Sequence, residues 1–227
     1  MEFDSEASLC LSCDTLCAMK RSALFLVMAI ASLCFAQDSP SAMTKLEVRL
    51  EGPDIPAGSF ATQPKIMYRV GTRYCRVEEQ EDKQNSIHTV LIINEPDFWM
   101  VNLTSKTARH GVDQGPTFNC HMPLFADDPD KEAAGLEFGL EKAFFESKGA
   151  VRHEGVVLQG KQATQYQLEI GHSKLALFTY GTPERPLAVG RVRAGKGEIF
   201  WYSGFGQVPF DAKLFAKPDG MTIEEIK

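Results

Sequence analysis

The adjacent residues Cys120 and His121 are the pair in this sequence whose side-chain types come closest to a catalytic pair. A cysteine thiolate acts as a nucleophile when a base such as histidine lies within hydrogen-bond distance. Adjacent residues of an extended chain, however, direct their side chains to opposite faces. Cys75 is the only other cysteine beyond residue 36, which makes it the natural disulfide partner of Cys120. We therefore predict no catalytic residue, and a candidate disulfide between Cys75 and Cys120.

The histidines and the remaining cysteines do not have the spacing of a metal site. The histidines are His88, His110, His121, His153 and His172. No two of them form a His-x-x-x-His pattern, which would place two ligands on one face of a helix. Cys10, Cys13 and Cys17 are closely spaced, but a zinc site of this kind needs a fourth ligand, and the neighbouring sequence supplies none. We predict no metal site and no cofactor.

Residues 19–36 have the layout of a secretory signal peptide. Met19-Lys20-Arg21 gives a basic start, an apolar run follows from Ala23 to Phe35, and Cys34-Phe35-Ala36 resembles a cleavage site. The apolar run has about 13 residues, fewer than the roughly 20 that span a bilayer as a helix. We therefore predict that the signal peptide is cleaved after Ala36 and that the protein is periplasmic.

The predicted signal peptide also determines how the segments before and after it are interpreted. Residues 1–18 fit no part of a signal peptide, so we interpret them as an upstream extension foreign to the natural protein. The alternative is a cytoplasmic tail on an uncleaved signal anchor. Ala31 and Leu33 match a lipoprotein signal poorly, so simple cleavage is preferred to lipidation of Cys34. Residues 37–227 are then predicted to form one domain.

Length and charge restrict the partners of the predicted mature chain. The chain has 227 residues, and removing the first 36 leaves 191, enough for one domain with a substantial core. Its net charge is −4, because the removed segment takes four acidic and two basic side chains from a total charge of −6. The absence of a basic tract argues against nucleic acid as a partner. No second long apolar run occurs, so no transmembrane segment is expected in the mature form.

From Thr44 onward apolar residues mostly occupy every second position, which is typical of half-buried β-strands. Leu46, Val48 and Leu50, for example, alternate with charged residues. Strands are predicted at 44–50, 66–70, 73–78, 87–93, 98–103, 106–110, 151–158, 162–170, 174–180, 186–193 and 198–202. Their short connections indicate antiparallel strands that neighbour one another.

The apolar period changes once, between Asp128 and Ser147. Asp128-Pro129-Asp130 is a favourable helix start. The apolar residues that follow lie close to one helical face; they are Leu136, Leu140, Phe144 and Phe145. We predict a helix from about Asp128 to Ser147 that packs on the sheet.

Three stretches of the chain occur in an order that one protein family shares. The first, Tyr68 to Glu78, combines a strand, a glycine turn and an Arg-x-Glu strand. The second, Gly160 to Leu168, is followed by the strand starting at Leu175, and the third, Asp211 to Gly220, has the form Asp-x-x-Leu-Phe-x-x-Pro-x-Gly. In these stretches the chain resembles the periplasmic lipoprotein carriers and their outer-membrane lipoprotein-sorting relatives, the LolA-like family. The resemblance covers most of residues 64–222.

The resemblance implies a mainly β fold: an unclosed antiparallel β-barrel of about ten to eleven strands with a helix packed across the concave face. It also implies an exported, non-enzymatic protein that holds lipid or lipoprotein acyl chains in an apolar groove. Family members usually begin with a helix before the first strand, whereas the predicted mature chain enters a strand almost at once. A general lipid-binding relative is therefore expected ahead of a lipoprotein shuttle.

Large apolar residues on the middle strands are the candidates to line such a groove, because each buried methylene contributes about 0.8 kcal/mol. They are Met67, Leu91, Ile93, Trp99, Leu177 and Trp201. The alternative role for each is packing in the core against the predicted helix. Two other functions stay open: an envelope protein that binds a partner through a sheet edge, and a small exported hydrolase.

Overall fold

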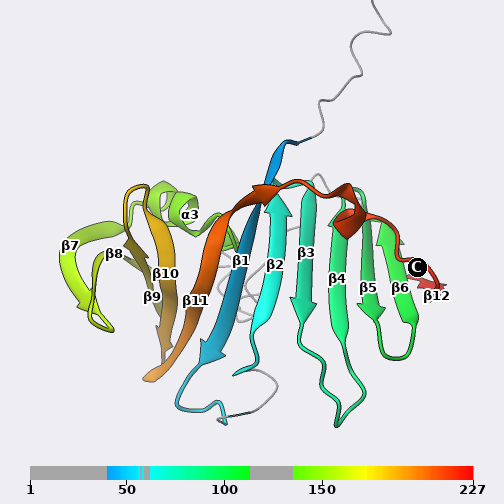
Figure 1. The fold of residues 1–227 in the computed structure, drawn as a ribbon. Helices are drawn as coiled ribbons and strands as arrows, with labels where there is room; N and C mark the ends of the chain where they lie inside the picture. Colours follow the sequence, from blue (N-terminus) through cyan, green and yellow to red (C-terminus); the bar gives the residue numbers. More distant parts are fainter. Residues whose placement is uncertain (1–39, 57, 59–61, 113–134, 227) are drawn as a thin grey trace, which may run out of the picture. The chain divides into compact units, whose positions relative to one another are not determined.

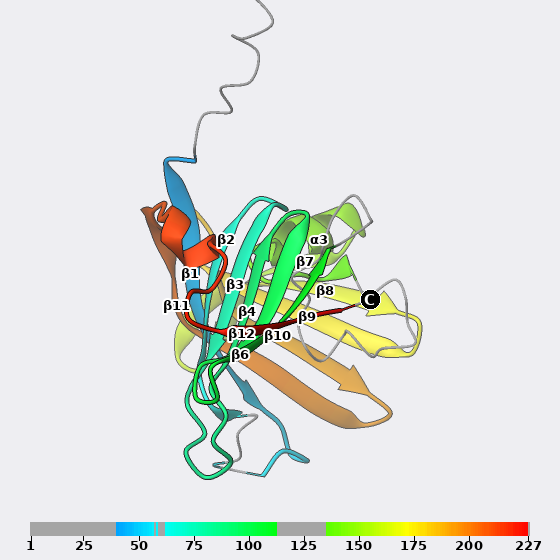
Figure 2. The ribbon, with the colours of Figure 1, turned by 90° about the vertical axis from the view of Figure 1, so that its right-hand side faces the viewer.

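The structure, a computed structural model, describes residues 40–56, 58, 62–112 and 135–226. These residues contain one sheet of twelve strands in the order β12-β6-β5-β4-β3-β2-β1-β11-β10-β9-β8-β7 (Figure 1). The sheet is strongly curved and does not close on itself, so β12 and β7 form its two edges (Figure 2). The predicted mainly β, unclosed architecture is confirmed.

Two antiparallel meanders make up eleven of the twelve strands. The first consists of β1 (Ala42–Glu51), β2 (Lys65–Val70), β3 (Tyr74–Glu79), β4 (Thr89–Asn94), β5 (Asp97–Asn102) and β6 (Thr107–Val112). The second consists of β7 (Val151–Leu158), β8 (Lys161–Ile170), β9 (Ser173–Tyr180), β10 (Arg185–Arg193) and β11 (Lys196–Pro209). The alternation of apolar and polar residues therefore predicted each of these strands, with small differences at most boundaries.

The pairing of β1 with β11 joins the two meanders. It runs from Ala42 opposite Pro209 to Glu51 opposite Ile199, with an irregularity between Glu47 and Val48. β11 extends well past Tyr202, where the sequence predicted its end. The alternation stops there because polar and glycine residues follow, but backbone pairing with β1 continues.

One strand was not predicted, and it is also the exception to the antiparallel pattern. β12 (Thr222–Glu225) pairs in parallel with β6 at the edge of the sheet. The prediction of ten to eleven strands was therefore one short of the twelve observed. A four-residue strand with a single apolar residue, Ile223, gives no recognisable alternation.

The predicted helix is shorter than expected. α3 spans Glu141–Ser147, whereas a start near Asp128 was predicted; residues 128–134 lie outside the described residues. Gly139, at a φ of +83°, has a left-handed conformation that does not occur within a right-handed helix, so the chain turns before α3 begins. Phe144 and Phe145 are buried as predicted, whereas Leu140 is 37% exposed.

The two faces of the sheet bury different apolar clusters. The larger cluster lies on the concave face, where it includes Leu46, Ile93, Phe145 and Phe200. The smaller cluster lies on the convex face of β4 to β6 and is centred on Trp99. The closing motif from Asp211 onward forms the short 3₁₀ helix η3 (Ala212–Phe215), in which the Asp211 side chain accepts a hydrogen bond from the Lys213 backbone nitrogen.

Candidate functional site on the concave face

A row of apolar side chains crosses the concave face from β1 to β5. Cross-strand register places Leu46, Met67, Val77, Leu91 and Met100 next to one another in this order, and directly opposed residues share one face of a sheet. The exposed fraction rises along the row from 0% at Leu46 and 1% at Met67 to 39% at Met100, with Val77 and Leu91 half-buried. We call these five residues the apolar row.

Four of the six predicted groove residues lie on this concave face. Met67 and Leu91 belong to the apolar row, Ile93 lies in the row next to it, and Leu177 is fully buried in the same cluster on β9. The remaining two side chains lie on the opposite face.

Trp99 and Trp201 are on the convex face because each is next to a residue that points inward. Trp99 follows Phe98 and stacks on His110, with ring centroids 5.2 Å apart. Trp201 follows the inward-pointing Phe200, and its Nε1 donates a hydrogen bond of 2.8 Å to Glu51. Side chains alternate between faces along a strand, so neither tryptophan can line a groove shared with Met67. Val77 and Met100 were missed, although the same alternation identifies them once the register is known.

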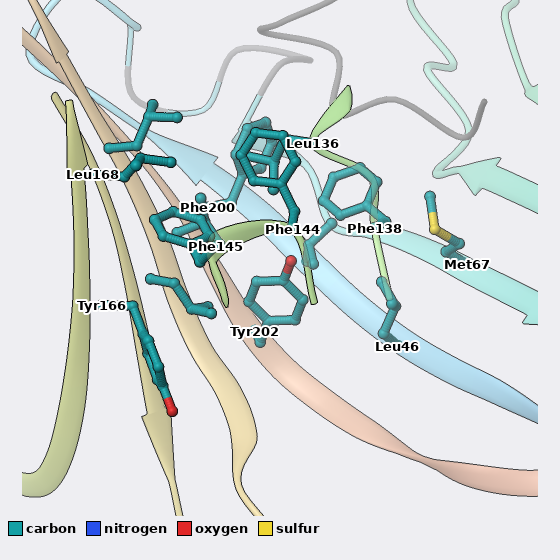
Figure 3. Close-up of a cluster of buried hydrophobic side chains, with 14 of the residues drawn as sticks. Leu46, Met67, Leu136, Phe138, Phe144, Phe145, Tyr166, Leu168, Phe200 and Tyr202 are labelled. Atoms are coloured by element: carbon teal, nitrogen blue, oxygen red, sulfur yellow. The ribbon is translucent and has the colours of Figure 1, made fainter. Parts of the chain in front are cut away.

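The segment 135–147 covers one end of the concave face. Leu136, Phe138 and Phe145 from this segment are almost completely buried, and they lie against Phe200 and Tyr202 of β11 (Figure 3). The Phe138 and Phe200 rings meet edge to face, with centroids 5.5 Å apart. α3 itself packs on β8 and β9. The buried part of the cluster is therefore core, whereas β3, β4 and β5 contribute the half-buried Val77, Leu91 and Phe98.

A buried ion pair fixes this segment to the sheet. Arg69 of β2 is 4% exposed and Glu137 is 8% exposed, and the Arg69 Nη2 atom lies 2.6 Å from a Glu137 carboxylate oxygen. Arg69 also donates hydrogen bonds of 2.8 Å to the Phe138 carbonyl and 2.7 Å to the Gly71 carbonyl. Such a pair is tolerated in an apolar interior only because its polar atoms have partners.

A second buried polar contact joins α3 to β11. The hydroxyl of Tyr202 donates a hydrogen bond to the Glu141 carboxylate, which also accepts one of 2.8 Å from the Gly139 backbone nitrogen. Burial raises the pKa of Glu141 above its usual value, and burial likewise raises the pKa of Tyr202. No sequence pattern indicated either buried acid, because Glu137 and Glu141 resemble ordinary surface residues of a helix.

A surface cluster around Glu184 holds the outer side of α3. The Glu184 carboxylate accepts hydrogen bonds of 2.7 Å from the Tyr166 hydroxyl, 2.8 Å from Lys142 and 3.1 Å from Arg152. Burial acts to raise the pKa of Glu184, but the hydrogen bonds outweigh it and hold the pKa at about 2. The hydrogen bond to Glu184 in turn raises the pKa of Lys142. Lys142 and Arg152 both have acidic partners. The cluster therefore attaches α3 to the sheet and is not a site for a bound anion.

His110 lies on the convex face between two carboxylates. Its Nε2 is 2.8 Å from Asp97 of β5, and its Nδ1 is 2.6 Å from Glu225 of β12. The hydrogen bond with Asp97, together with that to Glu225, raises the pKa of His110. The contact links the C-terminal strand to β6. Within the described part of the chain, no group of three His, Cys, Asp or Glu side chains is arranged to bind a metal ion.

Cys75 takes part in a disulfide bond. It is buried in the concave cluster on β3, in the row next to the apolar row. Its predicted partner Cys120, with His121 beside it, lies outside the described residues, so that pairing stays a prediction. No helix among the described residues is long and apolar enough to cross a membrane.

Comparison with known proteins gives likeness of fold only. No family model and no curated protein sequence matches the chain. An uncharacterized conserved protein from Thermus thermophilus is similar in structure, with a TM-score of 0.51 and 14% identity over 88% of this chain and 99% of that one. A LolA superfamily protein from Nitrosomonas europaea matches with a TM-score of 0.36 and 14% identity, over 79% of this chain and 91% of that one.

Proposed function

We propose that this protein is a non-enzymatic binding protein that holds the acyl chain of a lipid or lipoprotein on the concave face of its sheet. The observation that carries the proposal is the apolar row, in which five side chains from five successive strands form one continuous apolar strip. The strip begins in the core at Leu46 and ends at Met100, whose side chain is 39% exposed.

This gradient of exposure suits a hydrocarbon ligand. Neighbouring strands are about 4.8 Å apart, so five strands span about 19 Å. A chain lying along the row would cover Val77, Leu91 and Met100 and remove their remaining apolar surface from water. Each buried methylene of the ligand contributes about 0.8 kcal/mol, so several of them suffice for binding without any polar recognition.

Export and family membership belong to the same proposal. The signal peptide predicted at residues 19–36 would deliver the chain to the periplasm, where lipoproteins pass between membranes. The three motifs between Tyr68 and Gly220 support a LolA-like relative, and the open sheet with α3 on its concave side is consistent with one. In this account binding of a lipid is the property to test first, and a role in outer-membrane lipoprotein sorting is the narrower hypothesis that would follow from it.

A partner strand added at the sheet edge is the weaker alternative. β7 is an edge strand, and its Val151 and Val157 side chains are 59% and 60% exposed. However, its pairing is interrupted between His153 and Val156, where Gly155 has a φ of +70°. An irregular edge of this kind hinders the addition of a further strand.

Native mass spectrometry of protein purified gently from a bacterial periplasm, followed by lipid extraction, tests the proposal. The expected result is a co-purified lipid that is lost in Met100→Glu. Val112→Glu is the matched control, because Val112 is also an exposed apolar residue but lies on the convex face of β6. Equal lipid in both variants, or no lipid in a folded wild-type protein offered acyl chains, would contradict the proposal.

A further inference from the structure

A second apolar hollow, of about 570 Å³, lies over β8 to β11. Register places Gln167, Ala176, Gly190 and Ile199 side by side across these four strands. Their neighbours in the chain, Leu168, Leu175, Leu177, Val189 and Phe200, belong to the concave cluster. The hollow is therefore on the convex face, opposite the apolar row.

Small residues create the hollow. Ala176 and Gly190 occupy the middle of the row, and the larger Phe178, Val192 and Ile199 surround them. At the centre of the hollow the adjacent strands β9 and β10 therefore have almost no side-chain volume, whereas the surrounding positions have large side chains. The result is an apolar floor with apolar walls, of a size within the range of about 300–1,000 Å³ that ligand pockets occupy.

The fold does not require glycine at position 190. Gly190 is not among the residues with positive φ, so its backbone conformation is open to other amino acids. A Cβ atom built there would have its nearest neighbour, the Glu198 carbonyl oxygen, at 3.7 Å, which is an ordinary contact. Glycine inside a strand weakens it and often marks a place where a ligand approaches closely. Gly190 therefore keeps the hollow open at a cost to the strand.

The rim of the hollow favours an uncharged ligand. Its charged side chains are paired within the protein. On the convex face these pairs are Lys174 with Glu169 at 3.1 Å and Glu51 with Arg49 at 3.0 Å. Arg191 and Glu198 alternate with Gly190 and Ile199, so their side chains point to the opposite face, where they pair with each other at 3.1 Å. Gln165 and Gln167 also line the hollow, and their side-chain amides can donate to and accept from a hydroxyl, ester or amide group.

We propose that the convex hollow is a second binding site, for an uncharged amphiphile with one acyl chain and a hydroxyl or ester head. The chain lies on Ala176 and Gly190 between Phe178 and Val192, and the head meets Gln165 and Gln167. The site shares no side chain with the apolar row, so this proposal can be tested independently of the proposed function.

The test is a methyl NMR titration of the protein with 1-monododecanoylglycerol below its aggregation concentration, with dodecanoate as the charged counterpart. Saturable shifts are expected at Ala176, Val192 and Ile199. Gly190→Val should fill the hollow. The affinity for the probe, taken from these shifts, should fall at least tenfold, and the midpoint of unfolding should be unchanged or higher. Ala176→Leu is a second filling variant, should Gly190→Val fail to fold. Dodecanoate should bind the hollow at least tenfold more weakly at pH 8.

The two sites are separated by their own reporters. Shifts at Met100 report the concave face, and Leu91→Glu should remove these while the hollow still binds. The proposal is overturned if the hollow methyl groups do not move, if they move equally in Gly190→Val, or if dodecanoate binds there as tightly as the uncharged probe. Loss of the Met100 response alone would contradict the proposed function and leave the hollow intact.

Discussion

Arg69 on β2 and Glu137 in the segment before α3 form an ion pair of 2.6 Å that is almost fully buried. Glu137 thereby holds the segment 135–147 against the sheet beside Met67, where the apolar row enters the core. The contact matters for the proposed site because it fixes how much of the concave face the segment covers. Phe138, whose carbonyl accepts a hydrogen bond from Arg69, packs next to this pair.

Arg69→Met should destabilise the protein by about 3–5 kcal/mol, because it leaves the Glu137 carboxylate buried without its partner. Chemical denaturation measures the change. Arg49→Met is the control: Arg49 pairs with Glu51 at 3.0 Å, but both side chains are nearly half exposed, so the expected loss is about 0–1 kcal/mol. Equal losses in the two variants would show that the buried pair is unimportant. A double variant, Arg69→Met with Glu137→Leu, should recover part of the loss.

Glu141 predicts a dependence of stability on pH. Burial raises its pKa in the folded state, so its contribution to stability is complete below about pH 4.5 and is lost as the pH rises through the raised value. Glu141→Gln keeps an oxygen acceptor for Tyr202 and Gly139 without the charge. It should be more stable than the wild type at pH 8 and similar at pH 4. Unfolding midpoints over this range test the prediction, and parallel pH curves for the two proteins would contradict it.

Glu184 predicts a dependence of the opposite sign. Hydrogen bonds hold its pKa at about 2 in the folded state, so its contribution is present above about pH 4.5 and is lost as the pH falls toward 2. Glu184→Gln should cost about 1.5–3 kcal/mol at pH 7, as for hydrogen bonds to a charged group. Glu146→Gln on α3 is the control, since Glu146 is exposed and pairs with the same Lys142 at 3.6 Å. A similarly small loss of unfolding free energy in both variants would contradict the stabilising role of the Glu184 cluster.

His110 should attach β12 more firmly at low pH. Its pKa is raised by its hydrogen bond with Asp97 and by Glu225, so this stabilisation is complete below about pH 6.5 and is lost as the pH rises through the raised value. An NMR titration of the imidazole should give a pKa above 6.5, and Glu225→Gln should lower it. The protection of the Thr222–Glu225 amides, measured relative to their intrinsic exchange rates, should fall above that pKa. A His110 pKa at or below 6.5 would contradict this account.

The sequence predicted the strands well because their side chains alternate. Leu46, Val48 and Leu50 between charged neighbours are sufficient for β1, and comparable patterns locate the rest of both meanders. The sequence did not predict strands whose pairing depends on the backbone alone. These are β12 and the part of β11 that follows Tyr202. The helix start was wrong because apolar spacing around Leu136 suits a helix, whereas Gly139 turns the chain.

The candidate site was only partly predictable. Four of six residues proposed for the groove lie on the concave face, but Trp99 and Trp201 are on the other face, since size and hydrophobicity do not indicate direction. The face follows from register, and register is set by partners distant in sequence. For the same reason the apolar row, which links residues of five strands, and the pair Arg69–Glu137 could not be identified before the structure.

The measurement that tests the central claim most directly is a titration of protein labelled with ¹³C at the methionine methyl groups, using dodecanoate as the acyl probe. Met67 and Met100 lie in the apolar row, whereas Met221 packs against the convex cluster around Trp99. Acyl binding on the concave face predicts saturable shifts at Met100 and Met67 and none at Met221. A titration in which Met100 does not move, or in which only Met221 moves, would contradict the account.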